Sequence, residues 1–250
     1  MKVAVAENTE TTTIWHRCGE FPKLSDGIVH LWHLTLPKQQ PLESYAPLIT
    51  AEEVNRAKLF KREIDALRFA LGRIGLRTLL ANYFDIAPLK VRLVLNRFGK
   101  PLATRLNVHF NISHSGDSIL WAFSRSYELG IDVENTPIKQ VEEFRSFFSE
   151  QEMGYLVAQP NDQRIRAFHR LWVRKEACLK AAGCGFSLDP RLVEVLPDEV
   201  LLPVAPELSV QRLYLHDVIT PSCETAAVAI SAPCQTIHFL DLSSFSVSFQ

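Results

Sequence analysis

The residues of this sequence that could do chemistry begin with Asp132 and Glu134, two acids in the stretch LGIDVE. As a strand, this stretch places both carboxylates on one face and Ile131 and Val133 on the other, because side chains alternate along a strand. The apolar face suits packing on a core. Two like charges on one face are unfavourable unless a positive group lies between them. The acidic face therefore predicts a bound cation.

A third carboxylate is predicted on the edge of a helix over residues 163–182, whose buried stripe is expected to hold Ile165, Phe168, Trp172 and Leu179. At about 100° per residue, Glu176 lies about 40° from Trp172, and Lys180 lies one turn further along the same edge. The alternative is an exposed Glu–Lys pair, which would stabilise the helix by only roughly 0.2–0.5 kcal/mol.

Three carboxylates are hard oxygen ligands that suit Mg²⁺, whereas zinc sites favour thiolate and imidazole, and no histidine pair has zinc spacing. Magnesium in turn predicts a phosphorylated substrate. Positive or donor groups for phosphate are Lys180, Ser113 and His114 in FNISHS, and Lys100 in FGKP. Each has a structural alternative, since a lone histidine is more often structural and a lysine in a Gly-Pro turn is usually only solvated.

The elements that must position these residues are mixed. GIVHLWHLTL is predicted as a strand, and residues 50–84 as helical, starting with a capping box of Thr50 and Glu53 and including Leu59 in the apolar stripe. Residues 141–158 are predicted as a helix, and the part after Leu188 as short β-rich runs. Strands and helices therefore alternate in an α+β order, with predicted halves at residues 1–127 and 128–250.

Composition describes an ordinary globular chain. It has 250 residues, 47% of them hydrophobic and 22% charged, and a net charge of −1, which gives no support to nucleic-acid binding. The five cysteines lack metal-site spacing and are expected to be reduced thiols. The first residues contain too short an apolar run for a signal peptide, and no run is long enough to span a membrane. We therefore expect a cytoplasmic protein.

Four ordered segments then carry a resemblance: FGKP, FNISHS, GIDVE and LWVRKEACLKAAGCG. In this order and at these separations they closely resemble the 4'-phosphopantetheinyl transferases, in particular the long single-chain type that activates peptide and polyketide synthases. The likeness runs from about Asn96 to Gly185 and extends upstream through the arginine-rich helix. The resemblance implies a pseudo-twofold pair of similar α+β halves with the active site in the cleft between them.

The resemblance also assigns roles to residues. It implies that Mg²⁺ is held by Asp132, Glu134 and Glu176, so the missing positive group would be magnesium. It implies that the phosphates of coenzyme A are contacted by Arg56, Arg68, Lys100, Ser113, His114 and Lys180. The match of Arg56 is looser, because neighbouring Lys58 could serve instead.

The implied reaction is transfer of the 4'-phosphopantetheine arm of coenzyme A to a serine of an apo acyl or peptidyl carrier protein, with release of 3',5'-ADP. Glu176 is expected to accept the serine proton and Lys180 to stabilise phosphoryl oxygens. The carrier would belong to fatty acid, polyketide or nonribosomal peptide synthesis, and the enzyme is expected to be a monomer. Two alternatives are another Mg²⁺-dependent phosphoryl transferase and a non-catalytic module that binds coenzyme A or carrier proteins.

The segment after the acidic strand holds Phe144, Phe147 and Phe148, more aromatic surface than one helix face needs. One of these rings is expected to join an apolar patch that receives the carrier protein, although burial of all three is an equal alternative. Lys139 and Arg145 are expected to steer an acidic carrier.

Overall fold

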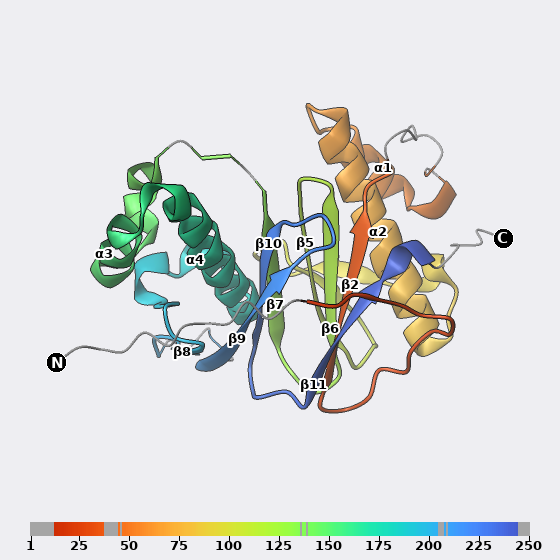
Figure 1. Cartoon of the computed structure of the whole chain (residues 1–250). Helices are drawn as coiled ribbons and strands as arrows, with labels where there is room; N and C mark the ends of the chain where they lie inside the picture. The colour runs from red at the N-terminus through yellow and green to blue at the C-terminus, as the bar shows by residue number, and fades with distance from the viewer. Residues whose placement is uncertain are drawn as a thin grey trace.

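The computed structural model describes residues 13–37, 45, 47–135, 137–138, 140–204, 208 and 210–244. Two sheets lie side by side, and each carries one long helix (Figure 1). The first sheet has the strand order β1-β11-β2-β6-β5. Its strands are β1 (His16–Arg17), β2 (Ile28–Thr35), β5 (His109–Ser115), β6 (Ser118–Ser124) and β11 (Thr236–Asp241).

The second sheet has the order β7-β10-β9-β8, and a small hairpin pairs β3 with β4. These strands are β7 (Leu129–Glu134), β8 (Glu199–Leu201), β9 (Arg212–Ile219), β10 (Thr225–Ile230), β3 (Leu93–Leu95) and β4 (Pro101–Ala103). The helices are α1 (Ala51–Ala57), α2 (Glu63–Phe84), α3 (Glu150–Ala158) and α4 (Asn161–Ala182). Within the described ranges, no helix is both long and apolar enough to cross a membrane.

The two sheets share one topology. In the first, β2 is followed by α2 and then by the hairpin β5–β6, with β6 paired between β2 and β5. In the second, β7 is followed by α4 and then by the hairpin β9–β10, with β10 paired between β7 and β9. The predicted α+β fold of two similar halves is therefore confirmed.

The last strand departs from the predicted division at residues 1–127 and 128–250. β11 belongs to the first sheet, where it runs parallel to β2 with Phe239 opposite Leu31. The chain therefore crosses back after β10, and residues 128–250 do not form one sheet. Because β11 fills the edge of β2, this crossing ties the halves together with backbone hydrogen bonds. The division into two domains stays a prediction.

Two predicted helices are each interrupted. The capping box of Thr50 and Glu53 is present, but α1 ends at Ala57 and α2 starts at Glu63. Leu59 lies in the turn between them and is 73% exposed, so its predicted place in a buried stripe is wrong. Residues 141–158 divide into a 3-10 helix and α3, because Ser149 forms a second capping box with Glu152 and starts a new helix.

Apolar side chains form three clusters that define the layers. One joins α2 to the first sheet around Trp32 and Trp121, and one joins α4 to the second sheet around Leu171 and Leu213. The third lies between the sheets and contains Val29, Leu31, Leu120, Ile131, Val133 and Val228. Alternation along each strand supplies both sides of a sheet. The predicted packing of Ile131 and Val133 on a core is thereby confirmed.

Candidate active site

The acidic face of β7 lies against α4, and there the structure brings three predicted site residues into direct contact. The ammonium of Lys180 donates to Asp132 Oδ1 at 2.6 Å and to Ser113 Oγ at 3.0 Å. It also donates to the carbonyl of Ile131 at 3.2 Å. The Ser113 hydroxyl donates to the same Asp132 oxygen at 2.8 Å. Lys180 therefore faces the acidic strand and does not form the alternative exposed pair with Glu176.

Gly130 explains how a helix comes so close to this strand. It shares a face of β7 with Asp132 and Glu134, because side chains alternate. A Cβ atom at Gly130 would lie 2.1 Å from the carbonyl oxygen of Ala177 and 2.4 Å from the nitrogen of Ala181. Both are backbone atoms of α4, which cannot yield as a flexible side chain can. The glycine of GIDVE thus sets the distance that lets Lys180 reach Asp132.

We predict that Gly130→Ala separates α4 from β7, lowering the free energy of unfolding by about 3 kcal/mol or more and reducing activity with it. The matched control is Gly154→Ala in α3, where nothing lies within 4 Å of the added Cβ. Because alanine is the better helix former, the control should gain roughly 0.5–1 kcal/mol. Denaturant unfolding of both variants checks this, and equal stability of Gly130→Ala and wild type would contradict the packing argument.

The seam between β5 and β7 is closed by side chains of β5. Asn111 Oδ1 accepts from the backbone nitrogen of Ile131 at 3.0 Å. Ser115 Oγ donates to Glu134 Oε2 at 3.1 Å and accepts from the backbone nitrogen of Asn135 at 3.1 Å. Together with Ser113, these residues occupy every second position of FNISHS, so their side chains lie on one face of β5. This alternation of polar residues is the sequence pattern that indicates their shared role. No role for Asn111 or Ser115 was predicted from the sequence.

Glu176 lies on α4 within the electrostatic reach of the other two acids. Burial raises its pKa to about 7, and the negative charges of Asp132 and Glu134 add to this rise, while Lys180 opposes it. The two acids of β7 and Glu176 therefore share one environment, as the resemblance implied. A carboxyl group with a pKa near neutral can exchange a proton at physiological pH.

The three carboxylates suit magnesium in their chemistry, although within the described ranges no three His, Cys, Asp or Glu side chains are gathered closely enough to hold a metal ion. Asp132 is 4% exposed, and its Oδ2 is buried without a hydrogen-bond partner in the described residues. A buried carboxylate oxygen without a donor is costly and is the kind of atom that a cation satisfies. Glu134 and Glu176 would have to turn toward it.

Two of the predicted phosphate contacts, His114 and Arg68, lie beside this site. Burial lowers the pKa of His114, and the nearby charges of Lys180 and Arg68 lower it further. Arg68 Nε and Nη2 donate to the carbonyl of Gly116 at 3.0 and 2.5 Å, and Nη1 donates to Asp65 at 2.8 Å. These contacts place Arg68 against the β5–β6 turn. Lys180, Arg68 and His114 therefore all lie near the end of β5.

The structure does not bring Lys100 and Arg56 to the carboxylates. The Lys100 ammonium donates to the carbonyl of Lys180 at 2.9 Å, at the carboxyl end of α4. It lines a hollow of about 290 Å³ with Glu128, the β3–β4 turn and residues 181–183, and none of the three carboxylates lines that hollow. Arg56 is exposed in the last turn of α1. The predicted role of both residues in phosphate binding stays a prediction.

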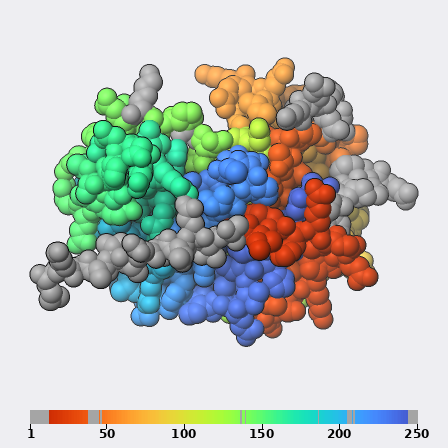
Figure 2. All heavy atoms as spheres, viewed as in Figure 1, coloured from red at the N-terminus to blue at the C-terminus, as the bar shows by residue number. Residues whose placement is uncertain are grey.

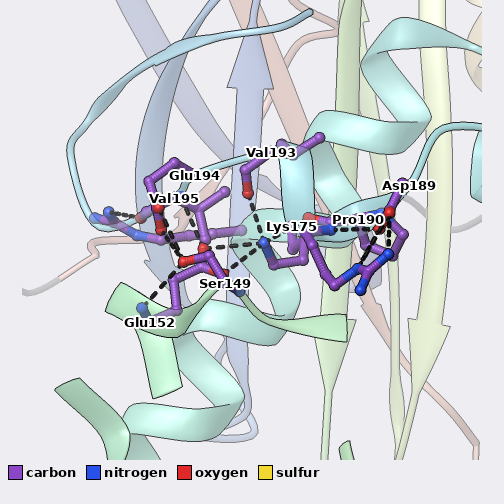
Figure 3. A network of polar contacts seen from close by, with 10 residues as sticks. Ser149, Glu152, Lys175, Asp189, Pro190, Val193, Glu194 and Val195 are labelled. Atoms are coloured by element: carbon purple, nitrogen blue, oxygen red, sulfur yellow. Dashed lines mark hydrogen bonds and ion pairs between the residues drawn. The ribbon is translucent and has the colours of Figure 1, made fainter. Parts of the chain in front are cut away.

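Lys175, which directly precedes Glu176, is a buried structural residue (Figure 3). Its ammonium donates to Glu152 Oε1 at 2.9 Å and to the carbonyls of Pro190 and Val193 at 2.8 and 2.5 Å. Glu152 also accepts from the backbone nitrogen of Val195 at 3.0 Å. These bonds hold α4 against α3 and against the loop that follows α4. They therefore fix the position of the helix that carries Glu176. Lys175 and Lys180 thus have different tasks.

The aromatic segment is mostly core. Phe148 is 2% exposed and packs edge-on against Phe168, so it is not the ring predicted to join the carrier-protein patch. The patch itself stays a prediction. Phe144 and Phe147 are half-buried and both contact Trp172. Arg145 pairs with Glu150 at 2.8 Å, and Lys139 lies outside the described residues. The described surface is hollowed between the green part of the second half and the orange part of the first half (Figure 2).

Two family models match consecutive parts of the chain. The family model described as the N-terminal part of 4'-phosphopantetheinyl transferase matches residues 32–125. The model described as the 4'-phosphopantetheinyl transferase superfamily matches residues 128–213. The second match contains all three carboxylates and Lys180, and the first contains Arg68, Ser113 and His114.

Individual proteins similar to this chain carry the same family name. The 4'-phosphopantetheinyl transferase HetI of Nostoc is 32% identical over 81% of this chain and 87% of its own length. The putative 4'-phosphopantetheinyl transferase slr0495 of Synechocystis is 34% identical over 66% of this chain and 69% of its own length. The 4'-phosphopantetheinyl transferase Sfp of Bacillus subtilis is 33% identical over 60% of this chain and 67% of its own length. The chain belongs to the 4'-phosphopantetheinyl transferase family and is a transferase enzyme.

Proposed function

We propose that the chain transfers the 4'-phosphopantetheine arm of coenzyme A to a serine of apo acyl or peptidyl carrier proteins and releases 3',5'-ADP. The observation that supports this most strongly is the contact of Lys180 with Asp132 and Ser113, beside Glu176, at the seam between the two halves. A cation and three acids at one place suit a substrate with a pyrophosphate and a metal ion between them.

We assign Asp132, Glu134 and Glu176 as the ligands of Mg²⁺. When bound, magnesium would neutralise charge on the pyrophosphate of coenzyme A. The proposed assignment rests on Asp132 Oδ2, which has no hydrogen-bond partner among the described residues, and on the oxygen ligands that all three side chains offer. Lys180, which already contacts Asp132, would stabilise the phosphoryl oxygens or the departing phosphate.

The transfer step needs a base for the acceptor serine. Its hydroxyl oxygen forms a bond to the phosphorus that carries the pantetheine, and the bond from that phosphorus to the bridging oxygen breaks. The bridging oxygen and its electron pair leave with 3',5'-ADP, and the serine proton goes to Glu176 or to a water beside it. The raised pKa of Glu176, about 7, supports this role because it makes the carboxylate a stronger base than an ordinary one.

Coenzyme A binding is predicted to depend on His114, Arg68 and Lys100. Neutral replacement of a residue that contacts a phosphate should remove roughly 1.5–3 kcal/mol and raise the coenzyme A KM by about 10- to 100-fold. Dephospho-coenzyme A should lose less wherever the contact is to the 3'-phosphate. The matched control is Arg92→Ala, which removes an exposed arginine of the β3–β4 region.

Steady-state kinetics with coenzyme A and with an apo carrier protein check this series. The carrier KM should stay constant in all variants. An unchanged coenzyme A KM in every one of the three variants would contradict the pocket. A lower melting temperature of Lys100→Ala with an unchanged coenzyme A KM would assign Lys100 to holding the end of α4, as its contact with the Lys180 carbonyl suggests.

The two alternatives differ from this proposal in what they consume. A non-catalytic module would bind coenzyme A without modifying a carrier protein, and another phosphoryl transferase would require a nucleoside triphosphate. The test is to incubate the chain with coenzyme A, Mg²⁺ and apo carrier proteins and to follow the mass of the carrier. We further propose that the enzyme acts as a monomer, because both similar halves lie in one chain, and that it acts in the cytoplasm, because its five cysteines are expected to be reduced thiols.

A further inference from the structure

A buried acid lies outside the carboxylate cluster. Glu224 follows the turn between β9 and β10 and is 2% exposed. Its carboxylate makes no ion pair among the described residues, so nothing described there compensates its charge directly. A buried carboxylate is costly unless hydrogen-bond donors surround it, and such a group calls for an explanation. The hydrogen-bond donors to the Glu224 carboxylate provide this explanation.

The donors to Glu224 come from both halves of the molecule. Within its own turn, Thr220 Oγ1 donates to Glu224 Oε2 at 2.6 Å. From the first half, the backbone nitrogen of Asp117 donates to Oε1 at 3.1 Å, and the Ser118 hydroxyl donates to Oε2. Glu224 thus reaches from the β9–β10 turn to the β5–β6 turn, and these turns are equivalent in the two similar halves (Figure 1).

The β5–β6 turn held by Glu224 is also the turn that contacts the site. The carbonyl of Gly116 accepts two hydrogen bonds from Arg68, and the Ser115 hydroxyl donates to Glu134. Gly116 has a φ of +54°, and a Cβ atom there would lie 2.6 Å from Glu224 Oε1 and 2.8 Å from Asn135 Nδ2. The turn is therefore in contact with Glu224 on one side and with Arg68 on the other.

We propose that Glu224 is a positioning residue for coenzyme A binding. By holding residues 116–118 against the second half, it keeps Arg68 and His114, from the first half, in place relative to Asp132 and Glu134 from the second. Its charge suits this task, because a carboxylate accepts several bonds at once and each is stronger than a bond to a neutral acceptor. The inference rests on the proposed function, since it concerns the coenzyme A side of that site.

The test compares Glu224→Gln with Val200→Ala, a control that truncates a buried side chain of β8 and touches neither turn. Glu224→Gln should speed hydrogen exchange of the Asp117 amide by about tenfold or more, since that amide loses a charged acceptor. It should raise the coenzyme A KM by about tenfold, with the carrier KM and kcat within about twofold of wild type. Val200→Ala should lower the melting temperature and move neither KM.

Ser118→Ala provides a second variant that removes one donor and keeps the carboxylate, with smaller changes in the same direction expected. Equal KM values in wild type, Glu224→Gln and Ser118→Ala would overturn the positioning role, as would an equal rise of the coenzyme A KM in Val200→Ala. A wild-type chain that neither binds coenzyme A nor modifies carriers would overturn the proposed function instead. Hydrogen exchange at Asp117 would still report in that case whether Glu224 holds the turn.

Discussion

Replacing Glu176 by Gln is expected to reduce transfer by at least about 100-fold, the least that loss of a general base usually costs. Glu176 has two proposed roles, as base and as metal ligand, so both are lost together. The same change should leave the metal-free protein at least as stable as wild type. Because burial and the acids of β7 raise the pKa of Glu176 from 4.5 to about 7, its ionisation costs the folded state stability as the pH rises through that window.

The Gln variant lacks this cost, so its melting temperature above pH 7 should equal or exceed that of wild type. Glu143→Gln, an exposed carboxylate of the second half, serves as the control and should change neither activity nor stability. Lys180→Ala should lose less activity than Glu176→Gln but should melt at a lower temperature, because it leaves Asp132 without its cation. Near-normal turnover by Glu176→Gln would remove Glu176 from the mechanism.

Removing divalent metal is expected to abolish transfer and to leave the fold unchanged. The contacts of this site are made by the chain itself: Asp132 is held by Lys180 and Ser113, and Glu134 by Ser115. The metal is therefore needed for the substrate and not for the structure. Chelation should stop turnover completely, while circular dichroism and the melting temperature change little. Added Mg²⁺ should restore activity.

The matched control for chelation is the Asp132→Asn variant, in which added Mg²⁺ should restore little activity because one proposed ligand is missing. Full activity in the presence of excess chelator would contradict the assignment of Mg²⁺. Loss of the circular dichroism signal on chelation would show instead that the metal holds the fold together.

Part of the site can be predicted from residue types and from the periodicity of side chains along strands and helices. The alternation of LGIDVE placed Asp132 and Glu134 on the face opposite Ile131 and Val133, and α4 covers that face in the structure. Helical spacing placed Glu176 at the edge of the buried stripe of its helix, where it is half-buried. Both placements depend on local geometry, which a short stretch of sequence determines. Only the resemblance implied that Glu176 meets the two acids of β7.

The contacts that depend on the path of the chain could not be predicted in this way. Nothing in FGKP indicates that Lys100 donates to the carbonyl of Lys180, eighty residues later. The return of β11 to the first sheet depends on which strand edge is free, and the β-rich ending alone does not reveal it. Ile165 fits the helical stripe but is 42% exposed, because it lies in the first turns of α4.

Gly130 and Asn111 show a third kind of residue, whose role is visible only when two elements meet. A glycine in a strand indicates a close approach, but the sequence does not say of what. In the structure the approach is that of α4, and the amide of Asn111 supplies a bond across the seam to β7. Gly130 lies in GIDVE and Asn111 in FNISHS, two of the motifs that carry the family resemblance. From the sequence, these motifs were expected only to contact ligands.

The central claim, that this chain moves the phosphopantetheine arm from coenzyme A to a carrier serine, is tested most directly by stoichiometry. The chain is incubated with coenzyme A, Mg²⁺ and an apo carrier protein without any nucleoside triphosphate, and both the intact mass of the carrier and the released 3',5'-ADP are measured. We predict a gain of one phosphopantetheine arm per carrier, one 3',5'-ADP per arm, and no gain on a carrier whose acceptor serine is replaced by alanine. Folded chain that binds coenzyme A but adds no mass to any apo carrier, or that requires a triphosphate to do so, would contradict the claim.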